Sequence, residues 1–162
     1  YSVEGSEVMS VDEANDYVDN LPAEERQYIY PFYVLVHGIT RVRLNGFNDK
    51  WDSGLGGFVY ADPDFRSNLA ANADIAKEVE YFVKQMDAYM MGDVWEIYDA
   101  ENKESYGPFY GEEEAEKELA YLEENNNTEC KIENKTYTKE EIINILANRF
   151  DGMELVRLAE MF

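Results

Sequence analysis

The residues of this sequence best suited to chemistry are one histidine, one aspartate and one serine: His37, Asp52 and Ser53. A serine beside an imidazole and a carboxylate can act as a nucleophile, with the histidine as its base. The serine opens the stretch "WDSGLGGFVYAD", in which three glycines fall within four positions. Such glycines could instead cradle a phosphate or simply shape the backbone, and the choice decides whether an enzyme is expected.

The glycine pattern matches none of the familiar catalytic motifs. A P-loop ends in Gly-Lys-Ser/Thr and enters a helix, but no lysine follows here and the chain continues into the strand-like "FVYAD". Gly54, Gly56 and Gly57 have the wrong spacing for a dinucleotide fingerprint, and Ser53 lacks the Gly-x-Ser-x-Gly surroundings of a nucleophile elbow. Glycines that enter a strand usually supply a positive φ or a bulge. We therefore interpret them as backbone architecture.

Metal and cofactor chemistry is not expected either. The chain has one histidine and one cysteine, Cys130, which is too few for a cluster of such ligands, and it contains no Asp-x-Asp-x-Asp-Gly calcium loop. With 35 acidic residues, a pair of carboxylates carries little information. We predict no catalytic residue, no metal and no cofactor. A small enzyme built around His37, Asp52 and Ser53 stays an alternative.

Caps and hydrophobic periodicity predict the elements that position these residues. Capping boxes at Ser10 and Thr138 predict helices to about residues 20 and 150, and an apolar stripe predicts a helix over 74–91 that ends at Gly92. Further expected elements are strands over 30–36, 41–44, 57–61, 94–98 and 104–109, a helix over 112–124, a hairpin over 128–138 turning near Asn134, and a last helix from Asp151-Gly152 to Phe162.

This mixture predicts an α+β fold: a small antiparallel sheet packed with amphipathic helices, and a helical C-terminus. Residues 1–124 would form the core with an acidic N-terminal helix, and residues 125–162 a hairpin and two helices packed on that core as one unit. Hydrophobic residues make up 45% of the 162, which suffices for one folded domain. With no apolar run of membrane length, we expect a cytoplasmic protein.

Acidic residues outnumber basic ones by 35 to 14, a net charge of −21. This charge argues against direct binding to nucleic acid or to an anionic membrane. It is also uneven. The net charge is −7 over residues 1–30, 0 over 31–70, −5 over 71–100, −8 over 101–130 and −1 over 131–162.

The densest acidic run is "GEEEAEKELAYLEE", where Glu112 and Glu116 stand four apart, so that like charges adjoin on the helix surface. B-DNA carries about one charge per 1.7 Å of axis, so ~10 base pairs present about 20 negative charges, comparable to the whole excess here. Several acidic elements would have to share a face to imitate it; a plain solvated helix face is the alternative. The candidate phosphate-mimicking acids are Glu112, Glu113, Glu116, Glu123, Glu78, Asp87, Asp12 and Asp16.

Residues 33–111 resemble a family of small acidic proteins carried by phages and conjugative elements of gut and Gram-positive bacteria. The matching stretches are "VHGIT", "WDSGLGGFVYA", "MDAYMMGDVWEIYD" and "YGPFYG", in order, over about half the chain. The sequence departs from the family pattern at His37-Gly38, which lacks a following serine, at Met86, where the pattern has tyrosine, and in having no cysteine before the last motif. The resemblance implies that Trp51, Asp52, Ser53, Gly54, Gly92 and Asp93 are a fold signature.

The N-terminal stretch "SVDEANDYVDNLPAEER" is similar to helical segments of acidic antirestriction proteins, which imitate DNA. Together the resemblances imply a mobile-element protein that occupies the basic DNA groove of a host restriction or CRISPR nuclease. Two other functions stay open besides this one: an inhibitor or adaptor that binds through exposed aromatic residues, and the small enzyme named above. A homodimer is also among the partners considered.

Overall fold

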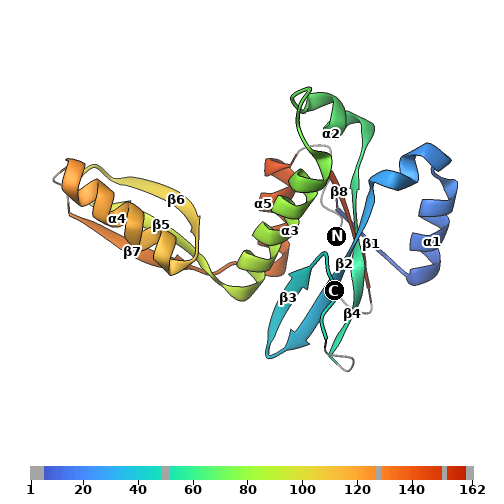
Figure 1. The fold of residues 1–162 in the computed structure, drawn as a ribbon. Coiled ribbons are helices and arrows are strands. Elements are labelled where there is room, and N and C mark those ends of the chain that lie inside the picture. The colour runs from blue at the N-terminus through green and yellow to red at the C-terminus, as the bar shows by residue number, and fades with distance from the viewer. Residues whose placement is uncertain (1–5, 49–51, 127–128, 151–152, 160–162) are drawn as a thin grey trace.

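The computed structural model describes residues 6–48, 52–126, 129–150 and 153–159, and Trp51 lies outside them. Helices and strands mix along the chain, so the α+β class is confirmed (Figure 1). In order, the elements are β1 (Ser6–Met9), α1 (Val11–Asn20), the 3₁₀ helix η1 (Ala23–Tyr28), β2 (Ile29–His37), β3 (Ile39–Arg43), β4 (Ser53–Ala61), α2 (Pro63–Asn68), α3 (Ile75–Met91), β5 (Val94–Asp99), β6 (Glu104–Tyr110), α4 (Glu112–Asn126), β7 (Cys130–Lys135), α5 (Lys139–Arg149) and β8 (Met153–Leu158).

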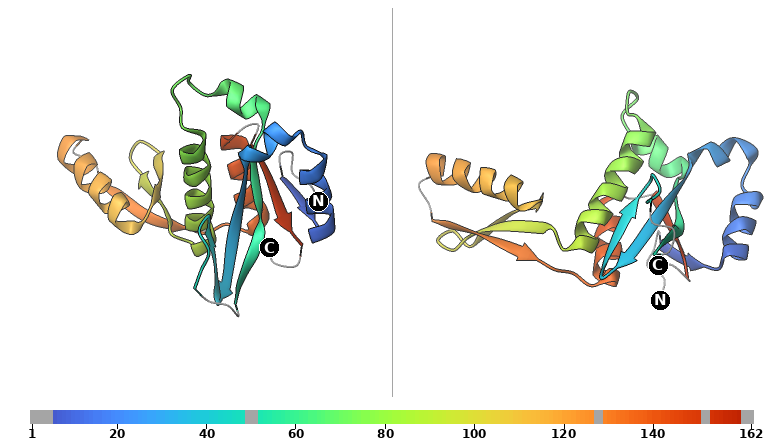
Figure 2. Two further views of the ribbon diagram at one scale, coloured as in Figure 1. Left: turned by 45° about the vertical axis from the view of Figure 1, so that its right-hand side comes forward. Right: turned by 60° about the horizontal axis from the view of Figure 1, so that its bottom comes forward.

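The strands form two separate sheets rather than the one small sheet expected. The larger has the order β1-β8-β4-β2-β3, and the smaller has the order β6-β5-β7. We call the described residues of 93–135, which hold the smaller sheet and α4, the lobe, and the remainder the body. The lobe projects sideways from the body in all three views (Figures 1 and 2).

Helices cover both faces of the large sheet of the body. The side chains of β4 illustrate this, because they alternate between two apolar clusters. Val59 and Ala61 belong to the main core under α3 and α5, whereas Phe58 and Tyr60 belong to a second cluster under α1. Successive side chains of a strand point to opposite faces, so α1 lies across the sheet from α3, as Figure 1 shows.

Two glycines of the opening motif let β4 lie in the middle of this sheet. A Cβ on Gly56 would stand 2.2 Å from a side-chain carbon of Val34, and one on Gly57, at φ 152°, would stand 1.9 Å from the backbone oxygen of Val156. The pairing of β4 with β2 also shifts register between Phe32 and Tyr33. The architectural interpretation of these two glycines is therefore confirmed.

The lobe has a much smaller core. α4 packs on its three-stranded sheet, and the core cluster there consists of Ile97, Leu122 and Cys130. Partly buried side chains of β6, β7 and α4 surround this cluster. The lobe is therefore a thin, two-layer unit.

The predicted last helix is wrong, because Met153–Leu158 is a strand. β8 lies between β1 and β4, parallel to the first and antiparallel to the second. Burial on both faces favours an extended segment here. The predicted hairpin over 128–138 is also a single strand, β7, which pairs with β5.

The segment 125–162 therefore divides between the two parts of the molecule. It contributes β7 to the lobe and α5 and β8 to the body. The chain thus leaves the body after α3 and returns to it through β7, so the two ends of the lobe are adjacent strands. Within the described ranges, no helix combines the length and apolar character of a membrane span.

Candidate functional site

The four candidate acids of the densest run all lie on α4 and are exposed: Glu112, Glu113, Glu116 and Glu123. Helix α4 carries seven glutamates and one lysine. That lysine, Lys117, lies 3.0 Å from the carboxylate of Glu113, and both side chains are mostly exposed. An exposed pair of this kind contributes little stability. The outer surface of α4 is therefore acidic, and the inner face of this helix packs on the sheet of the lobe.

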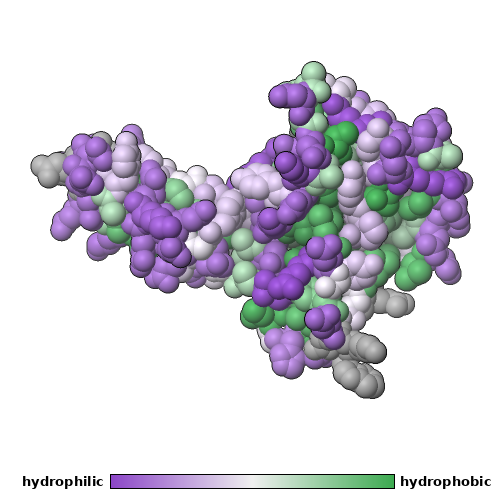
Figure 3. Space-filling view, in the orientation of Figure 1, coloured by the Kyte–Doolittle hydropathy of each residue, from purple (hydrophilic) through white to green (hydrophobic). Residues whose placement is uncertain are grey.

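The whole lobe shares this character. Residues 93–135 hold 14 acidic and 4 basic residues, a net charge of −10, nearly half of the total in about a quarter of the chain. Hydrophilic residues cover most of the lobe face seen in Figure 3, whereas apolar residues show in the body beside α3. The 15 residues of α4 extend about 22 Å, and B-DNA of that length carries about 13 charges. The charge of the lobe is therefore of the order that a short duplex presents.

The other candidate acids are not brought together with these. Asp12 and Asp16 lie on α1, across the large sheet from α3 (Figure 1). Glu78 and Asp87 lie on α3 in the body. The eight predicted acids thus lie on three separate helices and do not share one face, and the four on α4 form the largest group.

Asp87 makes an ion pair and hydrogen bonds that stabilise the fold. Its carboxylate accepts from Arg41 Nε and Nη2 at 3.0 and 3.1 Å and from the backbone N–H of Val42 at 2.8 Å. Val42 lies on β3, the edge strand of the large sheet, so the aspartate satisfies an edge amide that a sheet neighbour would otherwise bond. Only 16% of the Asp87 side chain is exposed. It attaches α3 to the sheet and offers no free carboxylate to a partner.

The structure does bring His37, Asp52 and Ser53 close together. His37 Nδ1 lies 2.9 Å from Asp52 Oδ2, and Ser53 begins β4 directly afterwards. However, 80% of the His37 side chain is exposed, and the two cavities described below are lined by other residues. Substrate sites are usually concave and enclosed, and an imidazole this exposed is not in such a setting.

Two further signature residues, Gly92 and Asp93, shape the junction between body and lobe. Gly92 caps α3 at φ 73°, as expected, and Asp93 accepts a hydrogen bond from Trp95 Nε1 at 2.9 Å. Asn134 of β7 donates to the backbone oxygens of Gly92 and Val94. These contacts fix the two strands on which the lobe is mounted.

A titratable group anchors the far end of the lobe. Asp99 accepts from the Asn102 side chain at 2.7 Å and from the backbone N–H groups of Asn102 and Glu101. These bonds, the Asn102 side chain first, lower the pKa of Asp99 below its ordinary value. Its charge thus holds the turn between β5 and β6.

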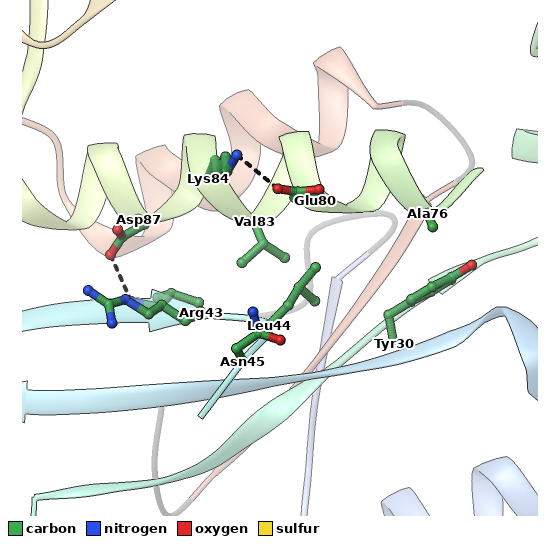
Figure 4. Close-up of a pocket in the computed structure, with 10 residues that line it drawn as sticks. Tyr30, Arg43, Leu44, Asn45, Ala76, Glu80, Val83, Lys84 and Asp87 are labelled. Atoms are coloured by element: carbon green, nitrogen blue, oxygen red, sulfur yellow. Dashed lines mark hydrogen bonds and ion pairs between the residues drawn. The ribbon is translucent and has the colours of Figure 1, made fainter. Parts of the chain in front are cut away.

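A cavity of about 490 Å³ opens between β3 and α3. Figure 4 shows Val83 and Leu44 directed into it, Tyr30 at one end, and Asp87 at the other. The Lys84 ammonium at its rim lies 2.8 Å from Glu80. Paired charges over an apolar wall provide no reactive group. Among the described residues, no three His, Cys, Asp or Glu side chains lie where they could hold a metal ion.

The chain matches no family model, and no curated protein or solved structure is significantly similar to it. The resemblance to mobile-element proteins stays a prediction. The function proposed below is therefore inferred from the surfaces of this molecule.

Proposed function

We propose that this chain is an anti-defence inhibitor whose acidic lobe occupies the basic DNA-binding groove of a host restriction or CRISPR nuclease. The observation that supports this proposal is the concentration of charge: residues 93–135 carry a net charge of −10, and their described part projects from the body (Figure 1). A projecting element can enter a groove that the whole body could not. The proposal narrows the mimicking acids to those of α4, and it leaves out α1 and Asp87.

Electrostatics gives the proposal its mechanism. Opposite potentials accelerate encounter, and their effect falls as salt is added. The Debye length is about 8 Å at physiological ionic strength, so the acids act chiefly on basic groups close to α4. Because α4 already packs on the sheet of the lobe, the helix backbone that carries the carboxylates need not be ordered on binding, which lowers the entropy lost.

The experiment is a DNA-cleavage assay with a panel of purified restriction enzymes and RNA-guided nucleases. The proposal predicts that the chain blocks cleavage by at least one nuclease, that DNA competes with it for the free enzyme, and that inhibition weakens as salt rises. Inhibition that ignores both DNA and salt would contradict mimicry.

A second candidate is a protein-binding lobe that uses aromatic residues. Tyr98 and Tyr121 are 37% and 59% exposed on the lobe, and tyrosine is enriched at protein interfaces. Substitution of both by serine would then remove binding at every salt concentration. Under the mimic proposal, the same change leaves the salt dependence in place.

A further inference from the structure

A second cavity of about 490 Å³ lies where the lobe meets the body. Its walls come from both parts: Pro108 and Tyr110 from β6 of the lobe, and residues of α3, α5 and the α2 region from the body. The volume is in the range of small-molecule sites. The chemistry of its lining identifies the kind of ligand.

Arg149 of α5 supplies a positive charge that meets no carboxylate among the described residues. The guanidinium donates to Gln85 Oε1 and to the hydroxyls of Tyr110 and Tyr89, all uncharged groups. Of the acids in the described ranges, none lies within ion-pair distance of it. Elsewhere in the body, the half-buried Arg41 and Arg66 each meet a carboxylate. Arg149 differs from these two in being exposed, and its hydrogen-bond partners among the described residues are neutral, so its positive charge stays accessible from the cavity.

The neutral partners orient this guanidinium rather than neutralise it. Gln85 is 2% exposed and accepts from Tyr110 at 2.9 Å as well as from Arg149. Burial raises the pKa of Tyr110, so its hydroxyl stays protonated and keeps donating to Gln85. An arginine has five N–H donors, and these three contacts leave two of them, with the charge, available to an acceptor in the cavity.

Aromatic side chains form the wall next to this charge. Phe65, Tyr81 and Phe150 line the cavity, and the rings of Tyr81 and Phe150 meet edge to face with centroids 6.1 Å apart. Such rings favour a flat apolar ligand body. Glu78 also lines the cavity, two helical turns before Gln85 on α3, or about 10 Å along the axis. It disfavours a second negative charge at that end.

We propose that this cavity binds a small aromatic monocarboxylate, with its carboxylate on Arg149 and its ring against Tyr81 and Phe150. A carboxylate fits the guanidinium fork better than a phosphate dianion does here, because Glu78 and the negative protein field both disfavour higher charge. The site is independent of the proposed function, since it lies at the base of the lobe and uses none of the α4 acids.

The test uses the full chain with benzoate as the probe, followed by calorimetry and by NMR shifts. The wild type should bind benzoate saturably, with shifts confined to the cavity lining. Arg149→Gln should weaken binding about tenfold or more, and Tyr81→Ala should weaken it less. Arg43→Gln, at the rim of the other cavity, is the matched control and should bind as the wild type does.

Charge variants of the probe test the polarity of the cavity. Benzene-1,4-dicarboxylate and phenyl phosphate should each bind more weakly than benzoate, and Glu78→Gln should narrow the difference. The proposal is overturned if benzoate does not saturate the wild type, or if Arg149→Gln binds it unchanged. Tighter binding of either dianion would also overturn it. Arg149→Lys, which keeps the charge, separates loss of the fork geometry from any folding defect, and near-UV circular dichroism checks the fold of each variant.

Discussion

The lobe and the body differ in the size of their apolar cores and in the density of their negative charge. The body buries a large apolar core on both faces of its sheet and pairs Arg41 and Arg66 with carboxylates. The separate core cluster of the lobe has only three buried residues, and the lobe carries almost half of the net charge. Charge repulsion opposes compact folding, so a thin unit with net charge −10 is tolerable only because a stable body holds both of its ends. The difference indicates a division of labour in which the body supplies stability and the lobe supplies the surface.

The largest expected effect is on the body. Gly57→Ala should destabilise the chain by about 3 kcal/mol or more, because the added Cβ meets the Val156 backbone oxygen at a φ that L-residues avoid. Urea unfolding followed by far-UV circular dichroism measures this. Gly46→Ala is the control, since a Cβ at Gly46 meets no atom within 4 Å. Equal stability of the two variants would show that the centre of the sheet is not as tightly packed as described.

Asp87 distinguishes a structural acid from a functional one. Asp87→Asn should cost roughly 2 kcal/mol, because it weakens a partly buried ion pair and the cap on the Val42 amide, and it should leave nuclease inhibition intact. Glu78→Gln, on the same helix, should change stability far less. A stable Asp87→Asn variant with weakened inhibition would return Asp87 to the list of phosphate mimics.

Acid should act on the lobe through Asp99. Since folding lowers the pKa of Asp99, its contribution is complete above the unfolded pKa, about 3.9, and is lost as pH falls through the lower folded value. Asp99→Asn should therefore flatten the acid-induced loss of lobe structure. The fluorescence of Trp95, the sole tryptophan in a Trp51→Phe background, reports it. Glu101→Gln serves as the control, and an unchanged acid profile for Asp99→Asn would contradict the role of its charge.

Salt should have the smallest effect on stability, and it should act mainly on the lobe. Neighbouring glutamates on α4 repel each other by a few tenths of a kcal/mol per pair, and salt screens this repulsion. Moderate salt should therefore stabilise the lobe slightly, as seen by Trp95 fluorescence, while the unfolding midpoint of the body changes less. A lobe that salt destabilises would mean that attractive pairs dominate there.

The sequence predicted local elements well where caps and periodicity act within a few residues. The capping box at Ser10 forms, with Glu13 reaching back to the Ser10 N–H, and the stripe that ends at Gly92 is α3. Strands β5 and β6 and helix α4 also lie where they were expected. Each of these elements depends on residues close to it in the chain.

The failures depend on partners distant in the chain. The stretch Met153–Leu158 has an apolar pattern too short to separate helix from strand, and its pairing with β1 joins the two ends of the chain. The Arg149 cluster was missed for the same reason, because α3, α5 and β6 supply it. One local signal was available: Gln85 is a polar residue on the buried side of α3, which indicates a partner inside.

The acids predicted to imitate phosphates show the same contrast between features set locally and features set by distant parts of the chain. Their exposure on α4 follows from the helix alone, whereas the position of Asp12 and Asp16 across the sheet depends on the whole fold. Sequence charge counts therefore predicted that the surface is acidic without predicting which acids share a face.

The most direct test of the proposal that the α4 acids inhibit a nuclease compares two variants of equal charge. One replaces Glu112, Glu116 and Glu123 of α4 with glutamine, and the other replaces Asp12, Asp16 and Asp19 of α1 with asparagine. Each loses three negative charges and leaves −18. In the cleavage assay, against a nuclease that the wild type inhibits, we expect about a tenfold or greater loss of inhibition for the α4 variant and less than about twofold for the α1 variant. Equal losses would mean that only the total charge matters, and a larger loss for the α1 variant would place the functional surface on the body.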